Sequence, residues 1–196
     1  MTSSTNITNI RNIINYVNQF IPEKYTITLF ENKYKTLVNN FTMDEKDCHQ
    51  DVVSLPGLLI FNNENNELMA YVTYSFERTS DGEEFLGINL SCTSSKYRRR
   101  QLSTYLRIVL FLYSIQNNIK YIASDVNPSS QSLLRKFGFK GKIDVYLEQF
   151  NWTYTFSVNT NNSKFKKAVN DFFNKRQKNQ IVSYESKKKK VKKLSY

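Results

Sequence analysis

Residues 86–139 decide the fold, and they read LGINLSCTSSKYRRRQLSTYLRIVLFLYSIQNNIKYIASDVNPSSQSLLRKFGF. The stretch opens within a run, residues 84–93, whose side chains alternate between apolar and polar, as those of a strand do. Residues 101–115 are apolar almost all round, as in a helix covered on several sides. Residues 121–123 predict a second strand. Strand, helix and strand at this spacing predict a crossover, so the two strands should be parallel.

The segments around this stretch predict further strands and helices. After residues 121–123, Asn127 and Pro128 are typical of a helix start, and Gly138 is typical of its end. Apolar spacing predicts two earlier helices, at residues 9–20 and 32–41. β-branched and aromatic runs separated by turn residues predict the other strands, at residues 25–30, 57–61, 68–76 and 148–159. The expected fold class is mixed α/β (α+β), with a central antiparallel and parallel sheet flanked by helices.

The strand at residues 84–93 is predicted to have one core face and one small, polar face. If the alternation is regular, the core face carries Leu86, Ile88, Leu90 and Cys92. The opposite face then carries Gly87, Asn89, Ser91 and Thr93. Taken alone, the polar face is typical of a half-solvated sheet, but the sequence that follows the strand favours a cleft.

Charge divides the chain into a nearly neutral body and a basic end. Residues 1–162 hold 16 Lys/Arg and 15 Asp/Glu, whereas residues 163–196 hold 12 and 2. We therefore expect a domain at residues 1–160, an amphipathic basic helix at 161–181 and a disordered Lys-rich tail at 182–196. The helix is interpreted as docked on the body, with a membrane-surface or partner helix as the alternative. The tail is either a solubilising segment or a nuclear-localisation or polyanion-binding run that contacts nucleic acid.

The two cysteines and the hydropathy of the chain indicate the cellular compartment. Cys48 and Cys92 are far apart in the sequence and are expected to be unpaired thiols, which suits a reducing environment. The first residues are polar, and no apolar run is long enough to predict a membrane span. The single histidine, His49, is interpreted as a loop residue rather than a metal ligand, so no metal is expected. A cytoplasmic or nuclear protein is predicted.

The turn Tyr97-Arg98-Arg99-Arg100-Gln101-Leu102-Ser103 lies between the predicted strand end and helix start. The first turn of a helix leaves backbone N–H groups unpaired and carries a partial positive charge. Three added arginines make this turn able to hold a pyrophosphate, although an isolated basic turn is more often only solvated. Neither a GxGxxG nor a Walker motif occurs elsewhere in the chain.

The two halves of the opening stretch together resemble the GNAT superfamily of acyl-CoA-dependent N-acyltransferases. Residues 98–103 resemble its turn signature, Arg/Gln-x-x-Gly-x-Gly/Ala. Residues 127–139 resemble its next motif, Asn-x-x-Ala-x-x-Leu-Tyr-x-Lys-x-Gly-Phe. The direct match covers about a third of the chain, and the preceding strands and helices follow the order of that fold. The resemblance implies a GNAT-like fold that uses acetyl-CoA as the acyl donor.

The resemblance also implies which residues bind the donor. The backbone of residues 91–93 would hold the pantetheine arm and the thioester carbonyl, and the amides of residues 99–103, with Arg98, would hold the pyrophosphate. Asn127 and Ser130 would line the pantetheine arm. The implied donor-binding residues are therefore Ser91, Cys92, Thr93, Arg98, Arg99, Arg100, Gln101, Leu102, Ser103, Asn127 and Ser130.

The chain departs from the family pattern at four positions. Gln101 and Ser103 replace small residues of the signature, so the Gln101 side chain must turn away from the ligand. Leu134 stands where the family often has a tyrosine that protonates the leaving thiolate, and Gly87 stands where some members have a glutamate base. Glu84 is the nearest acid on the strand and is the candidate base.

The sequence therefore predicts an N-acetyltransferase that transfers acetyl from acetyl-CoA to a primary amine by direct attack in a ternary complex. The amine acceptor, a protein or a small molecule, stays open. The acyl chain length also stays open, because residues 88–92 with Arg98 resemble N-myristoyltransferases, which share this fold. One alternative is a catalytically degenerate GNAT domain that binds acyl-CoA or a partner. A further alternative is a basic nucleic-acid-binding protein.

Overall fold

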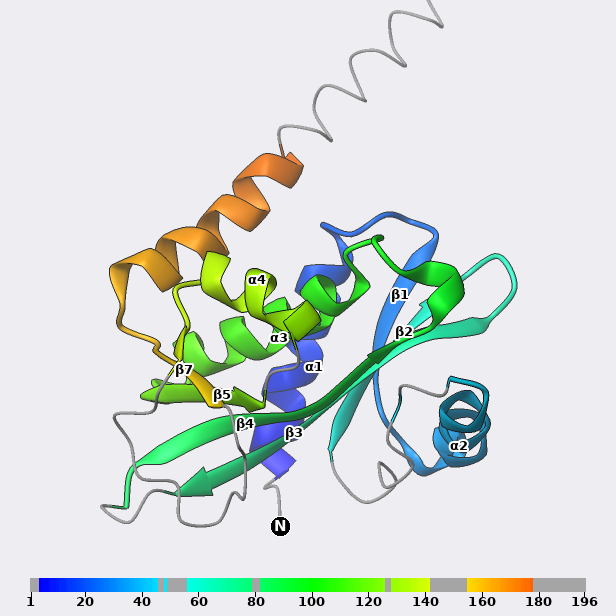
Figure 1. Ribbon diagram of the computed structural model, residues 1–196, viewed down its shortest axis with the longest axis horizontal. Helices are drawn as coiled ribbons and strands as arrows, with labels where there is room; N and C mark the ends of the chain where they lie inside the picture. Colours follow the sequence, from blue (N-terminus) through cyan, green and yellow to red (C-terminus); the bar gives the residue numbers. More distant parts are fainter. Residues whose placement is uncertain are drawn as a thin grey trace, which may run out of the picture.

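A seven-stranded mixed sheet forms the centre of the molecule, in the order β1-β2-β3-β4-β5-β7-β6 (Figure 1). The computed structural model describes residues 4–45, 48, 56–78, 82–125, 128–141 and 155–177. The strands are β1 (Tyr25–Leu29), β2 (Gly57–Asn62), β3 (Glu67–Arg78), β4 (Glu84–Thr93), β5 (Tyr121–Asp125), β6 (Lys140–Gly141) and β7 (Thr155–Asn159). Neighbouring strands are antiparallel except for β4 and β5, which are parallel, as predicted.

Helices cover both faces of this sheet. They are α1 (Ser4–Asn18), α2 (Lys35–Asp44), α3 (Leu102–Gln116), α4 (Pro128–Lys136) and a C-terminal helix at residues 163–177, with short 3-10 turns at Asn32–Tyr34 and Ser95–Tyr97. Figure 1 shows α1, α3, α4 and the C-terminal helix on one side and α2 on the other. The main core lies under the first group, and a smaller core lies under α2. The predicted mixed α/β class, with helices flanking the sheet, is confirmed.

The pairing of β3 with β4 contains a β-bulge that the sequence did not reveal. The register shifts between Val72 and Tyr74, so that the single residue Thr73 faces two residues of β4, Asn89 and Leu90. The backbone N–H of Leu90 donates to Thr73 Oγ1 at 3.1 Å, in place of a backbone acceptor on β3. The strand therefore reverses the facing of its side chains at this point.

The prediction that four alternating apolar residues of β4 share one face is consequently wrong. Leu86 and Ile88, before the bulge, belong to the main core beneath α1 and α3. Leu90 and Cys92, after it, pack into the smaller core with Val38 of α2. An extra residue in a strand moves every later side chain to the other face, which is the physical reason for the difference.

The expectation that the two cysteines are unpaired is also wrong. Cys48 and Cys92 form a disulfide, with their Cα atoms 5.8 Å apart. The bulge turns Cys92 toward the side of the sheet that α2 covers, and the segment after α2 carries Cys48 to the same side. The pair therefore ties this segment to the end of β4.

The C-terminal helix docks on the body, as the first interpretation of its amphipathic pattern predicted. Phe165, Val169, Phe172 and Phe173 are all buried in the main core. Phe165 packs against the ring of Phe111 in α3, with ring centroids 5.3 Å apart. Within the described ranges, no helix combines the length and hydropathy that a membrane crossing requires. The predicted Lys-rich tail at residues 182–196 lies outside the described residues.

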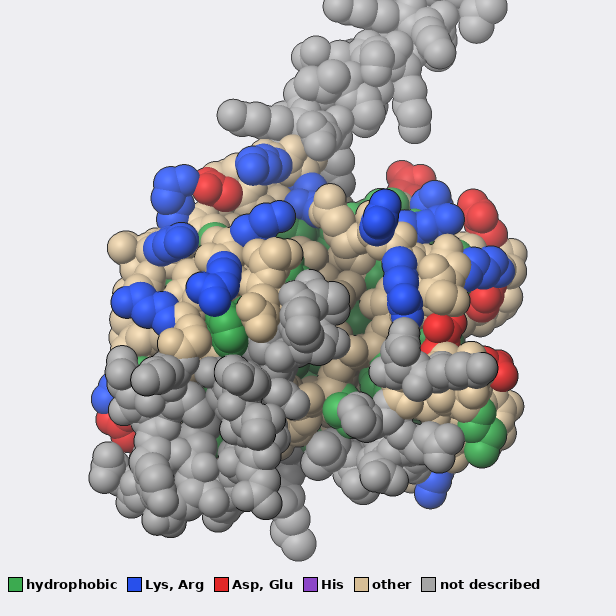
Figure 2. Space-filling model, viewed as in Figure 1, with side chains coloured by type: hydrophobic (Ala, Val, Ile, Leu, Met, Phe, Trp, Pro, Cys, Tyr) green, Lys and Arg blue, Asp and Glu red, His purple; other side chains and the backbone are tan. Residues whose placement is uncertain are grey.

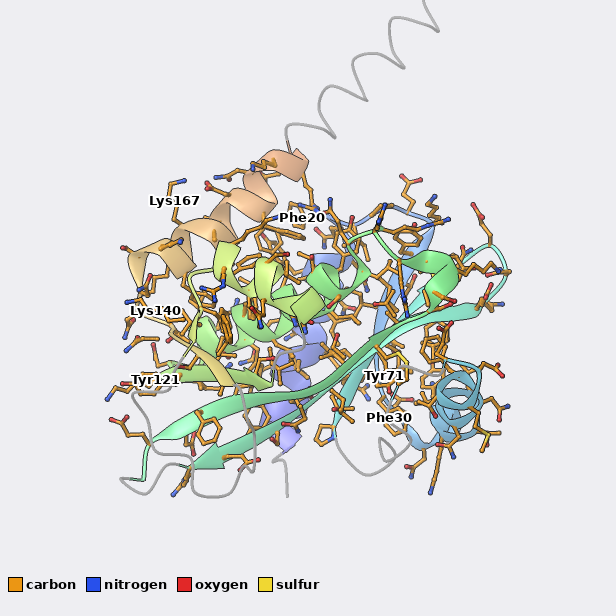
Figure 3. All side chains as sticks on the ribbon, in the orientation of Figure 1. Phe20, Phe30, Tyr71, Tyr121, Lys140 and Lys167 are labelled. Atoms are coloured by element: carbon orange, nitrogen blue, oxygen red, sulfur yellow. A yellow bond between two sulfur atoms is a disulfide. The ribbon has the colours of Figure 1, made fainter. Side chains whose placement is uncertain are left out.

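We expect Tyr71→Phe to stabilise the protein by about 1 kcal/mol. The Tyr71 hydroxyl is buried, and among the described residues it has no hydrogen-bond partner; burial raises the pKa of Tyr71 to about 12. Figure 3 shows the side chain next to α2, where its ring packs against Phe41. Urea unfolding at neutral pH measures the gain. Because the folded pKa is raised, wild-type stability falls as pH rises above about 10, so the gap should widen there. Destabilisation of the variant would show that the hydroxyl is paired.

Candidate functional site

β4 pairs with β5 along only one half of its length, so the backbone of the other half forms an open sheet edge. The parallel register with β5 ends at the pair Ile88–Ser124, whereas pairing with β3 continues to Thr93. Over residues 89–93, the side of β4 away from β3 has no strand partner among the described residues. An extended ligand can add to such an edge through backbone hydrogen bonds, as a further strand would. The predicted pantetheine-binding residues Ser91, Cys92 and Thr93 all lie on this half of β4.

The arginine turn leads from this edge to the start of α3, and its backbone is shaped for an anion. Arg99 and Gln101 have left-handed φ angles of 64° and 63°, and α3 begins at Leu102. Alternating left- and right-handed residues direct successive N–H groups into one concavity, and the free amides of a helix N-terminus add to it. Gln101, the N-cap residue, makes no side-chain capping hydrogen bond within the described part of the chain. The turn therefore brings left-handed residues and the free amides of a helix start together, and its binding of an anion stays a prediction.

Contacts on both sides hold the turn in place. The guanidinium of Arg100 lies over the ring of buried Tyr97, at 5.1 Å from its centroid. The Tyr97 hydroxyl donates to Glu67 Oε2 at 2.5 Å, and Lys96 forms an ion pair with the same carboxylate at 2.8 Å. These two donors lower the pKa of Glu67, so the carboxylate stays charged and keeps the turn anchored to β3.

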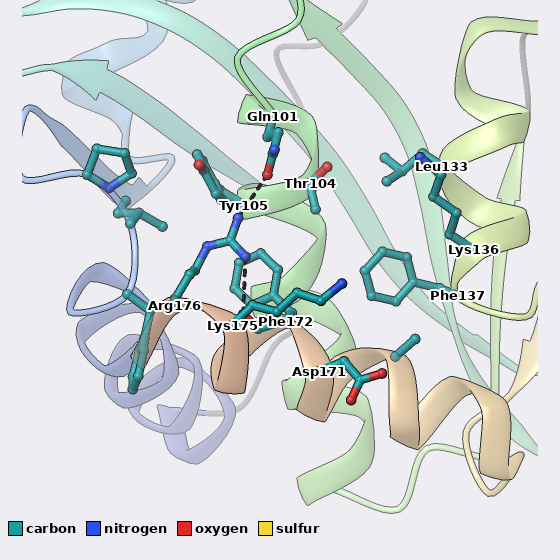
Figure 4. A pocket seen from close by; sticks show the side chains of 14 residues that line it. Gln101, Thr104, Tyr105, Leu133, Lys136, Phe137, Asp171, Phe172, Lys175 and Arg176 are labelled. Atoms are coloured by element: carbon teal, nitrogen blue, oxygen red, sulfur yellow. Dashed lines mark hydrogen bonds between the residues drawn. The ribbon is translucent and has the colours of Figure 1, made fainter. Parts of the chain in front are cut away.

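The Gln101 side chain points away from the backbone of the turn. Its Oε1 accepts a hydrogen bond from Arg176 Nη2 of the C-terminal helix at 2.8 Å (Figure 4). This is the orientation that a side chain at a small-residue position of the signature must take if a ligand is to approach the amides. Leu102 anchors the other side of the turn, because its side chain is buried in the main core.

A polar network joins β4 to α3 beneath the turn. The hydroxyl groups of Ser91 and Ser103 lie 3.2 Å apart, and Arg107 donates to Ser103 Oγ. The Arg107 side chain is 3% exposed, its Nε has no partner among the described residues, and burial lowers the pKa of its guanidinium to about 10. Sequence reasoning treated this helix as apolar almost all round and gave Arg107 no role in the site. Its spacing of four residues from Ser103 was the available signal.

The second predicted motif is described in part. Ser130 lies in the first turn of α4, and Gly138, with φ of 83°, ends the helix at the predicted place. Leu134, at the position of the family tyrosine, is fully buried in the main core and has no group that could donate a proton. Asn127 lies outside the described residues, as does His49. Among the residues that are described, no His, Cys, Asp and Glu cluster could hold a metal ion.

Two carboxylates stand near or on β4, in different settings. Glu84 lies at the first residue of the strand, 62% exposed, and pairs with Arg78 at 2.9 Å. Glu77 of β3 accepts a hydrogen bond from Ser75 Oγ at 2.8 Å, and Asn89 Nδ2 donates to the same hydroxyl at 3.2 Å. Glu77 pairs with Phe85, beside Glu84, so both carboxylates lie toward the end of β4 away from the turn. Of the two, Glu77 is linked through Ser75 to the bulge residue Asn89. Sequence reasoning missed Glu77 because it precedes the motif on another strand.

Comparisons with known proteins agree on the fold. No protein-family profile and no curated protein sequence matches the chain. Arabidopsis thaliana NAA60 in complex with acetyl-CoA aligns with a TM-score of 0.55 and 15% identity, over 70% of this chain and 99% of that one. Arabidopsis thaliana Naa50, in complex with the bisubstrate analogue CoA-Ac-MVNAL, gives 0.51 and 13%, over 68% and 96%. An acetyltransferase of the GNAT family from Staphylococcus aureus gives 0.51 and 13%, over 69% and 99%. The chain therefore has the fold of the GNAT acetyltransferases.

Proposed function

We propose that the protein is an N-acetyltransferase that transfers an acetyl group from acetyl-CoA to a primary amine, by direct attack in a ternary complex. The observation that carries this proposal is the continuity of two features, the open edge of β4 and the left-handed turn that leads into α3. Together they offer backbone groups along a thioester arm and amides around a pyrophosphate. Structures of the same fold hold acetyl-CoA or a CoA-based bisubstrate analogue, which supports the same donor here.

In this proposal, different residues bind different parts of acetyl-CoA. The amides of residues 99–103, with Arg98 and Arg100, hold the pyrophosphate. The edge of β4 at residues 89–93 holds the pantetheine arm, and one of its N–H groups donates to the thioester carbonyl as negative charge develops on that oxygen. The amine nitrogen forms a bond to the carbonyl carbon, and the carbon–sulfur bond then breaks. A thiol with a pKa near 8.5 leaves as a thiolate without an acid, so buried Leu134 is compatible with turnover.

The amine must give up a proton, and the structure offers Glu77 as a second candidate acceptor beside Glu84. Glu77 is joined through Ser75 to Asn89, where the edge of β4 begins to lack a strand partner. A proton acceptor within reach of the attacking amine, directly or through one water, fulfils the geometric requirement for a general base. We propose Glu77 in this role and keep Glu84 as the alternative.

The two carboxylates are distinguished by a matched pair of variants. We expect Glu77→Gln to lower kcat about 100-fold with little change in KM for acetyl-CoA, because base catalysis typically contributes 10²–10⁴-fold. Glu84→Gln, which loses only an exposed ion pair with Arg78, should retain wild-type kcat. Steady-state rates from pH 6 to 10 measure both, and the Glu77→Gln loss should shrink at high pH, where the amine is already neutral. The reverse pattern would assign the base to Glu84.

Activity is tested by incubating the full chain with acetyl-CoA and a panel of amines. The panel holds peptide N-termini, lysine side chains, polyamines and small amines, because the Naa50 analogue includes a peptide. Thiol release together with an acetyl mass increment on one class supports the proposal and identifies the acceptor. Tight acetyl-CoA binding with no transfer to any amine would instead favour a catalytically degenerate domain. The observations that favour this alternative are Leu134 in place of the family tyrosine and Gly87 in place of the glutamate.

The Lys-rich tail supports a further proposal, contact with nucleic acid or another polyanion. Removing residues 182–196 takes away a dense run of lysines from a chain with a net charge of +11. Acetyl transfer should survive this deletion, whereas nonspecific nucleic-acid binding should disappear. Loss of transfer on deletion would place the tail in the acceptor site.

A further inference from the structure

Arg107 is a charged side chain inside the protein, in the second turn of α3. It is 3% exposed, and no other Asp, Glu, Lys or Arg among the described residues is buried. Its Nε has no hydrogen-bond partner within the described ranges. A buried charge without an ionic partner lowers stability, and folds tolerate such a cost mainly at functional sites. Arg107 is therefore a candidate for a role in the site.

A short chain of hydrogen bonds connects Arg107 to the proposed donor site. The guanidinium donates through Nη1 to Ser103 Oγ, and this hydroxyl lies 3.2 Å from Ser91 Oγ. Ser103 ends the proposed anion turn, residues 97–103, and Ser91 lies on the half of β4 beyond its pairing with β5. The buried charge is therefore one hydrogen bond from the turn and two from the open edge of β4.

The setting of Arg107 makes its charge effective over this distance. Figure 2 shows Lys and Arg side chains gathered on one part of the surface, over α4, the C-terminal helix and the turn. Water and salt screen those surface charges. Water is excluded from around Arg107, so its field is weakened less, and no carboxylate among the described residues pairs with it. Burial lowers the pKa of Arg107 to about 10, so the guanidinium is still charged at neutral pH.

We propose that Arg107 is a positioning residue for the acyl donor, because its buried charge strengthens the hold of the anion turn on the donor's pyrophosphate. It acts through Ser103, from beneath the amides, without touching the ligand. The inference rests on the proposed function, since the turn must hold the pyrophosphate. In the free protein the charge has no ionic partner among the described residues, and a bound pyrophosphate supplies one. The same side chain should therefore lower stability and raise donor affinity.

Arg107→Met is expected to weaken acetyl-CoA binding about 10-fold while it raises the free energy of unfolding. Methionine removes the charge and keeps a similar volume. The opposite signs separate an electrostatic role from a structural one, because lost packing would lower affinity and stability together. The loss of affinity should persist at higher salt concentration, since a buried charge is screened less than a surface charge. Arg107→Lys, which restores a charge at this position, should recover most of the affinity.

Calorimetric titration with acetyl-CoA and urea unfolding of the full chain test the proposal in the wild type and in both variants. The matched control is Arg11→Met, the same substitution at an exposed arginine of α1 that pairs with Glu31. It removes one positive charge from the surface and should keep the wild-type affinity.

Equal acetyl-CoA affinity in Arg107→Met and the wild type would overturn the inference and leave the proposed function intact. Weaker binding together with lower stability would reduce Arg107 to a structural role, and so would a failure of Arg107→Lys to recover affinity. An equal loss in Arg11→Met would assign the effect to net charge alone. If the wild type does not bind acetyl-CoA, the inference and the proposed function fail together.

Discussion

An Arg98→Ala/Arg100→Ala variant is expected to bind acetyl-CoA about 100-fold more weakly than the wild-type chain. Each charge-assisted hydrogen bond to a phosphate contributes about 1.5–3 kcal/mol, and two such side chains flank the amides of the anion turn. Arg100 is already oriented by its contact with Tyr97, so little ordering free energy is lost when it binds. Calorimetric titration at two salt concentrations measures the loss and shows whether it is electrostatic.

The control for this prediction removes two arginines elsewhere. Arg11 and Arg78 are both exposed and pair with Glu31 and Glu84. An Arg11→Ala/Arg78→Ala variant has the same net charge as the turn variant and should retain nearly all of the wild-type affinity. Equal losses in the two variants would mean that only the overall charge attracts the donor and that the turn is not its site.

Arg107→Met is expected to raise the free energy of unfolding by about 3 kcal/mol. The Arg107 guanidinium is buried between α3 and the sheet, donates to Ser103, and has no carboxylate partner among the described residues. Among the described residues, no carboxylate balances this buried charge, and a buried charge without an ionic partner is costly. Methionine fills a similar volume without a charge, and Ser91 and Ser103 still contact each other. Urea unfolding of both chains measures the difference.

The pH dependence of this gain follows from the direction of the pKa shift. Burial lowers the pKa of Arg107 from 12.5 to about 10, so the folded wild type carries the penalty at every pH below that value. The penalty diminishes only as pH rises above it, and the gain in Arg107→Met should therefore be constant between about pH 5 and 9. Arg107→Lys, which keeps a charge, should gain nothing. A variant that is less stable than the wild type, with a loss that depends on pH near 4, would reveal a carboxylate partner.

Sequence reasoning succeeded where the signal is local. The apolar helix after β4, the helix start at Pro128 and the stop at Gly138 each follow from the side chains of a few consecutive residues. The parallel pairing of β4 and β5 followed from the helix between them. The arginine turn lies between a strand end and a helix start, as predicted, whereas anion binding by this turn stays a prediction. The left-handed angles at Arg99 and Gln101 were not apparent, because neither residue is a glycine.

The features that were missed depend on contacts between distant segments. The bulge at Asn89 and Leu90 leaves the alternation in the sequence intact, because the smaller core accepts Leu90 and Cys92 as readily as the main core would. The pairing of Cys92 with Cys48 is a contact across 44 residues. The bond from Arg176 to Gln101 spans 75 residues, and no motif contains both partners. Such contacts follow from packing, which local patterns do not determine.

Backbone hydrogen exchange with and without acetyl-CoA tests the central claim most directly, because the proposed site consists largely of amides. We expect slower exchange at residues 99–103 and 89–93 when acetyl-CoA is added, and we expect this protection to be lost in the Arg98→Ala/Arg100→Ala variant. Unchanged exchange in both segments at saturating acetyl-CoA, or protection confined to other parts of the chain, would contradict it.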